Sequence, residues 1–332
     1  MLELQQPFHV FSAEDVRTAL PMDEAVKAMK AAFRELSTGE VTVPLRTHME
    51  LPEYEADVLV MSCYSPRLEQ VGMKIITLHP NNVERGLPYI QATVMVVDAE
   101  RGTPLAVMSG AALTAIRTGA GAGAATDVLA RSDATHVAVI GSGVQAAAQL
   151  EAMCAVRDIR SAAVFDLDHV RAASFASRLS KELKIEVVPV ATPSAALADA
   201  DIICTATTSR TPVLDDADIE PGTHINAIGV YKPEEREIPG ATIARARVVV
   251  EEYEAAWEEA GELIMACKAG LIGEDHIHAE AGEILAGKKE GRQTDDEITL
   301  FKSVGVANQD LSAAHLVLAR GTTLGLGSAV SL

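Results

Sequence analysis

Three cationic residues interrupt apolar or small-residue stretches in the first third of the chain: Arg46 in VPLRTHM, Lys74 in GMKIITLHPNN and Arg117 in LTAIRTGAG. If the stretch around Lys74 is a strand, alternation puts Lys74 on the same face as Ile76 and Leu78. An ammonium group among apolar side chains is costly unless an anion meets it. The three cations together predict a carboxylate-binding site, in which arginine offers a planar fork and lysine a compact charge.

The anion that meets Lys74 is open to two interpretations. We expect a substrate, rather than another side chain, to supply it, and the alternative is a structural ion pair with Glu50, Glu53 or Asp57. Taken singly, each of the three cations also fits a surface or structural role. A buried lysine beside two arginines should have a lowered pKa, which suits proton exchange with an amine or imine.

A second group of residues predicts a nucleotide site in the middle of the chain. Gly141, Gly143 and Ala146 form G-x-G-x-x-A directly after the apolar run HVAVI and at the start of a helical pattern. The first glycine permits a tight turn, the second lets a pyrophosphate approach the backbone, and the small third residue lets helix and strand pack. The context favours dinucleotide binding over a purely structural glycine turn.

The acid that follows the next strand indicates which dinucleotide binds. Asp166 in VFDLD lies about 20 residues beyond the glycine turn, where a carboxylate accepts a hydrogen bond from the adenosine ribose. Asp168 adds negative charge, and no arginine lies between Asp166 and Arg171, so a 2′-phosphate would be repelled. NAD(H) is therefore favoured over NADP(H). The alternative is that Asp166 only caps the following helix.

The elements that position these residues fall into two kinds. The first third predicts a helical stretch that Ser12 caps and Gly39 ends, then strands over 41–49, 58–63, 72–78 and 90–98, and a small-residue helix over 113–129. This pattern is typical of an antiparallel α+β lobe. From residue 136 short apolar strands alternate with helices, which indicates a parallel doubly wound sheet. Beyond Glu251 we expect helix to about Asp296, then a turn and a long helix from about Ser303.

Length and composition limit the kind of protein. The 332 residues, 48% of them hydrophobic, are enough for two lobes, and a net charge of −19 argues against nucleic acid or an anionic membrane as partner. The four cysteines are scattered without metal or redox spacing, so we expect no metal site. Neither a signal peptide nor a membrane-spanning run is recognisable, which predicts a soluble, cytoplasmic protein.

Several motifs in one order resemble the ornithine cyclodeaminase/μ-crystallin family: VPLR, K-x-x-x-x-H-P-x-N, L-T-A-x-R-T, G-x-G-x-Q, H-I-N-A-I-G and ITLFKSVGVANQD. The resemblance covers nearly the whole chain. It implies a Rossmann doubly wound parallel sheet, over 119–301, inserted into an α+β domain for substrate binding and dimerisation, over 1–118 plus 302–332. It also implies a homodimer in which the sheets of two subunits combine.

The resemblance also implies roles for individual residues. Arg46, Lys74 and Arg117 would face the substrate carboxylate and imine, and Arg117 would also approach the cofactor. Val144 and Gln145 would contact the pyrophosphate and Asp166 the ribose. The positions lining the nicotinamide side would be Thr207, Ala227, Ile228, Gly229, Ser303 and Val304, the last of these also touching substrate. Asp310 in ANQDLSA would be an acid near the site that relays a proton, with helix capping or packing as its alternative, and His79 a secondary relay or a turn residue.

One position departs from the family pattern. Cyclodeaminases carry an aspartate for the side-chain amine of ornithine in the segment after N-A-x-G, and here Tyr231 stands in its place. Lys232 adds a positive charge, which is wrong for holding an ammonium group. Glu234 and Glu235 are close in sequence and leave substitution for the aspartate open. Tyr231 is instead expected to fill the substrate pocket.

These observations favour NADH-dependent reduction of an imine next to a carboxylate. The substrate would be a cyclic imine such as Δ1-pyrroline-2-carboxylate, or the imine of pyruvate and ammonia, as in alanine dehydrogenase. Two alternatives stay open. One is ornithine cyclodeaminase, which forms proline and ammonia with NAD+ as a catalytic cofactor. The other is a non-catalytic protein that binds nucleotide and a small ligand, as in the μ-crystallin branch.

Overall fold

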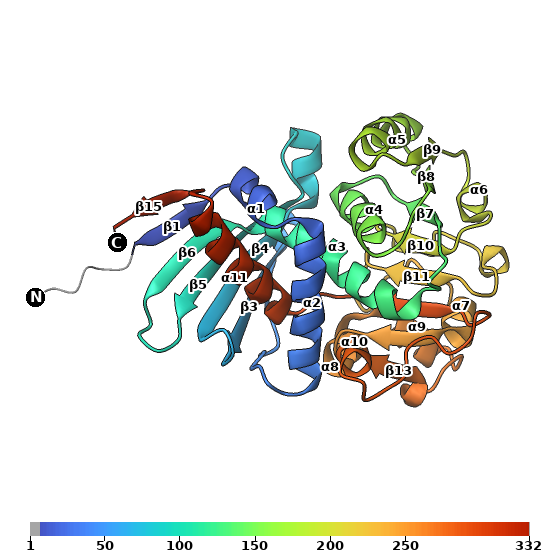
Figure 1. The fold of residues 1–332 in the computed structure, drawn as a ribbon. Helices are drawn as coiled ribbons and strands as arrows, with labels where there is room; N and C mark the ends of the chain where they lie inside the picture. Colours follow the sequence, from blue (N-terminus) through green and yellow to red (C-terminus); the bar gives the residue numbers. More distant parts are fainter. Residues whose placement is uncertain (1–6, 332) are drawn as a thin grey trace, which may run out of the picture. The chain divides into compact units, whose positions relative to one another are not determined.

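The computed structural model describes residues 7–331 and divides into two compact units (Figure 1). The first unit holds the described residues up to Arg117 together with those from Val306 onwards, and the second unit runs from Thr118 to Gly305. One boundary falls inside helix α3 (Gly110–Leu129), and the other lies just before helix α11 (Ala307–Thr323). The first unit is therefore built from two segments far apart in the sequence.

The first unit contains a seven-stranded sheet with the order β15-β1-β6-β5-β4-β3-β2. Neighbouring strands are antiparallel except β1 and β6, which are parallel. The expected antiparallel α+β character is confirmed. The strands are β1 (Phe8–Phe11), β2 (Thr47–Leu51), β3 (Ala56–Ser65), β4 (Gln70–Leu78), β5 (Ile90–Asp98), β6 (Pro104–Ser109) and β15 (Ser328–Val330).

The helical stretch predicted after Ser12 is two helices rather than one. Ser12 caps α1 (Ala13–Ala19) as expected, through a capping box with Asp15. The chain then breaks at Pro21, which has no backbone N–H to continue the helix and which precedes α2 (Met22–Ser37). Short 3-10 helices cover Pro52–Tyr54 and Pro80–Arg85.

Helix α11 packs on the face of the sheet that carries Lys74, and Figure 1 shows it running across the strands beside α2. Burial alternates along β4: Gly72, Lys74, Ile76 and Leu78 are buried, as alternation predicts. Gly72 lets the helix come close, since a Cβ at this position would lie 2.9 Å from Leu311 Cβ. The absence of a side chain at Gly72 thus brings the start of α11 against the middle of β4.

The opposite face of the same sheet carries exposed apolar side chains. Met73 and Ile75 alternate with the buried residues of β4 and are 37% and 52% exposed. Tyr64 on β3 and Met49 on β2 lie on the same face, as the strand register shows, and are exposed as well. An apolar face of this kind is a candidate protein contact.

One strand prediction in this unit needs correction, and three strands were not predicted. The strand expected over 41–49 begins only at Thr47, and before it Thr42 makes a single bridge to Tyr64. Pro44 has no N–H to donate to a ladder, which accounts for the interruption. The short strands β1, β6 and β15 were not predicted, because runs of three to six residues carry little periodicity.

The second unit is an eight-stranded parallel sheet with the order β13-β12-β14-β11-β10-β7-β8-β9. The first five strands along the chain follow the doubly wound order, so the predicted Rossmann fold is confirmed, with its switch point between β7 and β10. The strands are β7 (His136–Ile140), β8 (Ser161–Phe165), β9 (Glu186–Pro189), β10 (Ile202–Thr205), β11 (His224–Ala227), β12 (Arg247–Val250), β13 (Ile277–Glu280) and β14 (Thr299–Lys302).

The helices of this unit follow the strands, as the alternating pattern predicted. They are α4 (Val144–Val156), α5 (His169–Leu183), α6 (Pro193–Leu197), α7 (Gly240–Arg245), α8 (Tyr253–Glu259), α9 (Gly261–Lys268) and α10 (Ala281–Leu285), with 3-10 turns over Asp216–Asp218 and Glu274–His276. Between residues 7 and 331, no helix combines the length and apolar content needed to cross a bilayer.

Two predictions beyond Glu251 are wrong. The stretch expected to be helical to about Asp296 contains β13, and the expected turn before Ser303 is β14, a fully buried strand between β11 and β12. The helix expected from about Ser303 begins at Ala307. A four-residue strand that is buried on both faces reads as a short apolar run, which periodicity does not distinguish from a turn or helix start.

The close contact at Gly72 gives the first testable prediction. The Gly72→Ala variant should lower the free energy of unfolding by about 1–3 kcal/mol, because the added methyl group forces α11 away from β4. Urea denaturation followed by circular dichroism measures this change. A variant that unfolds at the urea concentration of the unmodified protein would show that α11 does not depend on this contact.

Candidate active site

A buried ion cluster joins three elements of the first unit. Lys74 of β4 is 1% exposed, and its Nζ lies 2.6 Å from Oδ2 of Asp310 on α11. The other carboxylate oxygen, Oδ1, accepts a hydrogen bond from Nε of Arg117 at 2.9 Å, and Arg117 belongs to α3. Asp310 is therefore shared between the two cations.

This pairing corrects one expectation. Lys74 is met by an internal carboxylate, so the expectation that only a substrate supplies the negative charge is wrong. The acids named as alternatives are not its partner either: Glu50 and Glu53 are exposed, and Asp57 pairs with His48 at 2.7 Å. Sequence reasoning placed Asp310 near the site but did not pair it with Lys74, because strand and helix are more than 200 residues apart.

The cluster sets the protonation of its members. The pKa of Lys74 is lowered to about 8, chiefly by burial and also by the charges of Arg117 and Arg46, while Asp310 acts in the opposite direction. Burial alone would raise the pKa of Asp310, but the charges of Arg117 and Lys74 outweigh it, and that pKa lies below its ordinary value. The lowered pKa expected for Lys74 is confirmed. The site thus holds an ionised carboxylate beside a lysine that exchanges its proton near pH 8.

The charges of the cluster do not cancel. Arg46 is half-buried and lies near enough for its charge to act on Lys74. Lys74 and Arg117 both lie against the single carboxylate of Asp310, so this pair of cations keeps one positive charge, which favours an incoming anion. Gln309, which sequence reasoning missed, accepts a hydrogen bond from Nη1 of Arg117 at 2.6 Å and helps to fix the guanidinium.

His79 lies at the end of β4 and takes part in a turn. Its backbone N–H donates to the carbonyl of Tyr89 at 2.9 Å, and its own carbonyl accepts from Asn82 at 3.1 Å. These bonds fit the interpretation of His79 as a turn residue before Pro80.

The glycine turn of the second unit has the geometry of a phosphate site. Gly141 has φ of +102°, which other residues rarely adopt, and a Cβ there would lie 2.6 Å from the carbonyl oxygen of Ala206. Gly143 caps α4, and a Cβ there would meet no atom of the chain within 4 Å. The fold does not require this second glycine, whereas a ligand at the helix N-terminus would.

Two neighbours of these glycines support the same use of the turn. Ala146 is fully buried, as helix–strand packing predicts. Oε1 of Gln145 is buried without a hydrogen-bond partner among the described residues, and Val144 beside it is exposed. An unpaired polar atom in the first turn of α4 is consistent with a ligand that completes the site.

Asp166 lies directly after β8 and contacts the glycine turn. Its carboxylate accepts hydrogen bonds from the backbone N–H and the hydroxyl of Ser142, at 2.9 and 2.6 Å. Burial acts to raise the pKa of Asp166, but hydrogen bonds from Ser142 and the nearby charge of Arg171 lower it overall. The helix α5 is capped by Asp168, not by Asp166, so the capping alternative for Asp166 is wrong.

The residues expected on the nicotinamide side follow three adjacent strands of the second unit. Thr207 follows β10, Ala227 ends β11, and Ser303 follows β14. Because parallel strands end at the same edge of a sheet, these loops lie beside one another, and they carry Ile228, Gly229 and Val304 as well. Sequence reasoning missed two buried acids, Glu237 and Glu251, that bind the backbone of these loops.

The segment that departs from the family pattern is partly engaged within the second unit. Tyr231 is half-buried, and Nζ of Lys232 lies 5.9 Å from the centre of its ring. Glu235 forms an ion pair with Arg210 at 3.2 Å, and Glu234 is exposed. Glu235 therefore has a cationic partner of its own.

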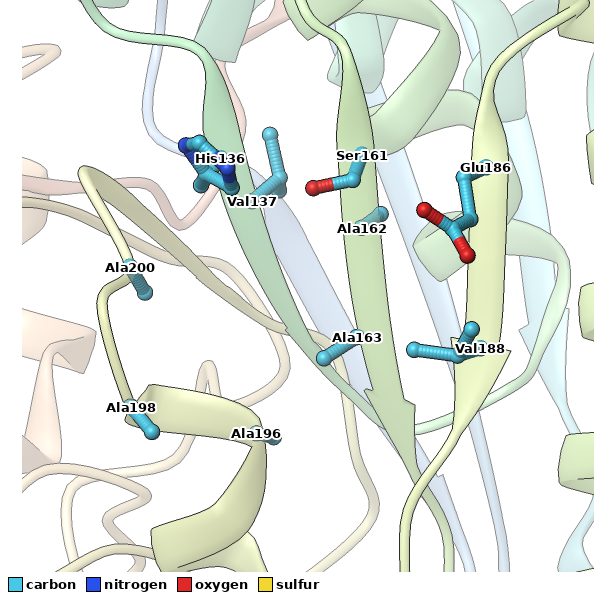
Figure 2. A pocket seen from close by; sticks show the side chains of 10 residues that line it. All are labelled: His136, Val137, Ser161, Ala162, Ala163, Glu186, Val188, Ala196, Ala198 and Ala200. Carbon is cyan, nitrogen blue, oxygen red and sulfur yellow. The ribbon is translucent and has the colours of Figure 1, made fainter.

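A hollow in the second unit lies at the other edge of the sheet. Figure 2 shows His136, Ser161 and Glu186 around it, at or near the starts of β7, β8 and β9. The glycine turn follows the end of β7, and parallel sheets bind ligands at their carboxyl edge. The hollow is therefore separate from the nucleotide site.

The lowered pKa of Lys74 makes stability depend on pH in a defined window. Below about pH 8 Lys74 is charged in both the folded and the unfolded state, and burial of its charge lowers the free energy of unfolding. Above its ordinary pKa of 10.5 it is neutral in both, and this cost is gone. Between these values the unfolded chain binds more protons, so stability rises with pH.

The Lys74→Met variant lacks this titration. The free energy of unfolding of the unmodified protein minus that of Lys74→Met should therefore rise by up to about 3 kcal/mol from pH 8 to 10.5. Urea denaturation of both proteins at several pH values measures this difference. Titrating groups that the two proteins share contribute equally to both free energies and therefore cancel. A difference that stays constant across this window would contradict burial of a charged Lys74.

Comparison with known proteins places this geometry in a family. The family model described as "Ornithine cyclodeaminase/mu-crystallin family" matches residues 8–323. A Δ(1)-pyrroline-2-carboxylate reductase of Bacillus cereus is 37% identical over 322 residues, which cover 97% of this chain and 99% of that protein.

Two solved structures share the fold over nearly the full length. The Δ(1)-pyrroline-2-carboxylate reductase of Thermococcus litoralis, in complex with NADH and L-proline, has a TM-score of 0.95 and 40% identity, covering 97% of this chain and 100% of the other. An archaeal alanine dehydrogenase dimer with bound NAD has a TM-score of 0.92 and 34% identity, covering 98% and 100%. The chain belongs to the ornithine cyclodeaminase/mu-crystallin family.

Proposed function

We propose that the protein uses NADH to reduce an imine next to a carboxylate, with Δ1-pyrroline-2-carboxylate as its substrate and proline as the product. The observation that carries the proposal is the buried Lys74–Asp310–Arg117 cluster, which keeps a positive charge and a lysine with a pKa of about 8. Its relatives of known name include reductases and dehydrogenases that act on such compounds. A site with these properties suits an anionic substrate whose nitrogen changes its protonation.

The arginines bind the substrate carboxylate. Arg117 is held by Asp310 and Gln309, so its guanidinium is fixed before substrate arrives. Arg46 is half-buried near Lys74 and supplies a second cation. Preorganised cations lower the cost of ordering the complex and align the imine.

Lys74 orients the imine and supplies a proton to its nitrogen. Reduction of the imine adds a hydride to the carbon and a proton to the nitrogen, so the site needs a group that is protonated at neutral pH and can give up that proton. A pKa of about 8 meets this requirement and lets Lys74 regain the proton from solvent. The carboxylate of Asp310 holds the ammonium group of Lys74 in place and takes part in the proton relay.

The second unit binds the dinucleotide, which supplies the hydride when bound. Gly141, Gly143 and the N-terminus of α4 would hold its pyrophosphate, with Val144, Gln145 and Ala146 in the first turn. Asp166 would bind the adenosine ribose, and the loops after β10, β11 and β14 would line the nicotinamide half. The carboxylates of Asp166 and Asp168 favour NAD(H) over NADP(H).

Alanine dehydrogenase chemistry is the second candidate. The archaeal alanine dehydrogenase supports it through its likeness to this chain, and the imine of pyruvate and ammonia carries the same carboxylate. Ornithine cyclisation is disfavoured, since Tyr231 replaces the aspartate and Glu235 already pairs with Arg210. A non-catalytic role does not need a lysine of lowered pKa.

A direct assay tests the function. The protein is mixed with NADH and Δ1-pyrroline-2-carboxylate, and in a second reaction with NADH, pyruvate and ammonia, and the loss of NADH is followed. We expect turnover with the cyclic imine. Turnover with pyruvate and ammonia alone would favour the second candidate, and proline formed from ornithine without net NADH change would favour the cyclodeaminase.

The Lys74→Met variant tests the role of the lysine. Turnover should fall by about 100-fold or more, the range of a lost general acid, while NADH still binds, because the nucleotide residues belong to the other unit. Turnover is measured under saturating substrate, and binding by NADH fluorescence. Unchanged turnover would remove Lys74 from the mechanism.

The exposed apolar face of the first-unit sheet is the proposed dimer contact. Met49, Tyr64, Met73 and Ile75 lie on it, and an archaeal alanine dehydrogenase of the same fold is a dimer. Light scattering after size exclusion should give twice the chain mass of 35.1 kDa. A monomer mass, or a dimer that survives Ile75→Glu, would contradict this contact.

We also assign the protein to the cytoplasm. All four cysteines are free, which fits a reducing compartment. The NADH that the proposed reaction consumes is an intracellular reductant.

A further inference from the structure

Two buried carboxylates lie under the loops at the carboxyl edge of the second-unit sheet. Glu237 is 0% exposed and Glu251 is 2% exposed. Neither belongs to the glycine turn or to the cation cluster of the first unit. Buried acids normally satisfy local donors or act on a ligand, so their partners decide their role.

Glu237 ties the loop after β10 to the loop after β11. Its Oε1 accepts the backbone N–H of Thr207 at 2.7 Å, and its Oε2 accepts the N–H of Gly229 at 2.7 Å and the hydroxyl of Thr205 at 2.9 Å. A Cβ on Gly229 would lie 2.5 Å from both carboxylate oxygens. The backbone carbonyl oxygen of Thr207 lies 2.5 Å from the same position, so the glycine of the N-A-I-G motif lets the two loops and the carboxylate meet.

Glu251 does the same for the loop after β14. It directly follows β12, and its Oε1 accepts the hydroxyl of Ser303 at 2.8 Å. Its Oε2 accepts the backbone N–H groups of Val304 and Gly305 at 2.9 and 2.6 Å. The two acids together fix three adjacent loops.

The partners indicate that both acids are ionised. Backbone N–H groups only donate, and four of them point at these carboxylates, so the oxygens must accept. Burial raises the pKa of Glu237 above its ordinary value, although hydrogen bonds from Thr207 and the charge of Lys302 act against this, so it is the hydrogen-bond donors that indicate ionisation. Lys302 is fully buried and pairs with Glu262 at 3.1 Å. The donors to Glu237 and Glu251 named above are backbone N–H groups and hydroxyls, which carry no charge.

The position of the loops follows from the strand order. Asp166 follows β8, on one side of β7, so the adenosine half of a dinucleotide lies there. The other half lies across the switch point, over β10, β11 and β14. This placement rests on the proposed function. It puts the nicotinamide ring over the loops that Glu237 and Glu251 hold.

We propose that Glu237 and Glu251 are positioning residues that fix the ring-binding loops and shift binding toward NAD+ relative to NADH. The nicotinamide ring is positive when oxidised and neutral when reduced. Fixed negative charge beneath it stabilises the oxidised form alone. The same charge favours departure of hydride from NADH, because the cofactor becomes positive as the hydride leaves.

The ratio of the two dissociation constants tests this inference. Kd for NADH is measured by fluorescence, and Kd for NAD+ and ADP-ribose by competition with NADH. In Glu237→Gln and in Glu251→Gln the preference for NAD+ over NADH should fall at least about fivefold. The affinity for ADP-ribose, which has no nicotinamide ring, should fall less than that for NAD+.

Two sets of variants separate charge from shape. Glu237→Asp and Glu251→Asp keep the charge while shortening the side chain, and should keep the ratio within about twofold. Glu186→Gln removes the same charge at the opposite edge of the sheet and should leave the ratio unchanged. An unchanged ratio in both glutamine variants, or an equal shift in the aspartate variants, would overturn the charge effect.

The outcomes also separate this inference from the proposed function. A protein that binds both dinucleotides but reduces no imine would contradict the reductase, while the ratio still decides the role of the two acids. An unmodified protein that binds neither NAD+ nor NADH would overturn both.

Discussion

The fold of the first unit is organised around one buried carboxylate. Asp310 neutralises only one of the two cations that touch it, and desolvation makes any unpaired charge costly in that place. The arrangement is stable enough to hold two cations beside each other, yet it leaves them short of negative charge. In the proposed reaction a substrate carboxylate would complete the charge balance that the chain itself leaves open, which would link the energetics of folding to the selection of ligand.

In the second unit buried carboxylates lie at the edge of the sheet proposed to bind ligand. Its ligand-facing edge consists of loops whose backbone N–H groups would be unpaired if no acceptor lay behind them. Glu237 and Glu251 supply acceptors from positions that no ligand needs to touch. The cluster in the first unit thus keeps positive charge, which suits the proposed anionic substrate. The two acids in the second unit carry negative charge, which suits the proposed oxidised nicotinamide ring.

Sequence reasoning succeeded where a motif or a period carried the information. The parallel sheet, the glycine turn, the buried face of β4 and the lowered pKa of Lys74 followed from spacing and residue type. It failed at strands of three to six residues such as β14. It also failed to predict the break that Pro21 makes between α1 and α2. It also missed the Lys74–Asp310 pair and the two acids under the loops, because contacts between distant segments leave no local pattern. The roles of the site residues remain predictions.

The return of the chain to the first unit has a consequence for biosynthesis. Arg117 precedes Asp310 by 193 residues, and the whole second unit is translated between them. Until α11 emerges from the ribosome, Lys74 and Arg117 lack their counter-ion and β4 lacks the helix that covers it. The N-terminal part of the first unit therefore cannot complete its core until the second unit has been synthesised, and Lys74 and Arg117 gain their shared carboxylate only near the end of translation.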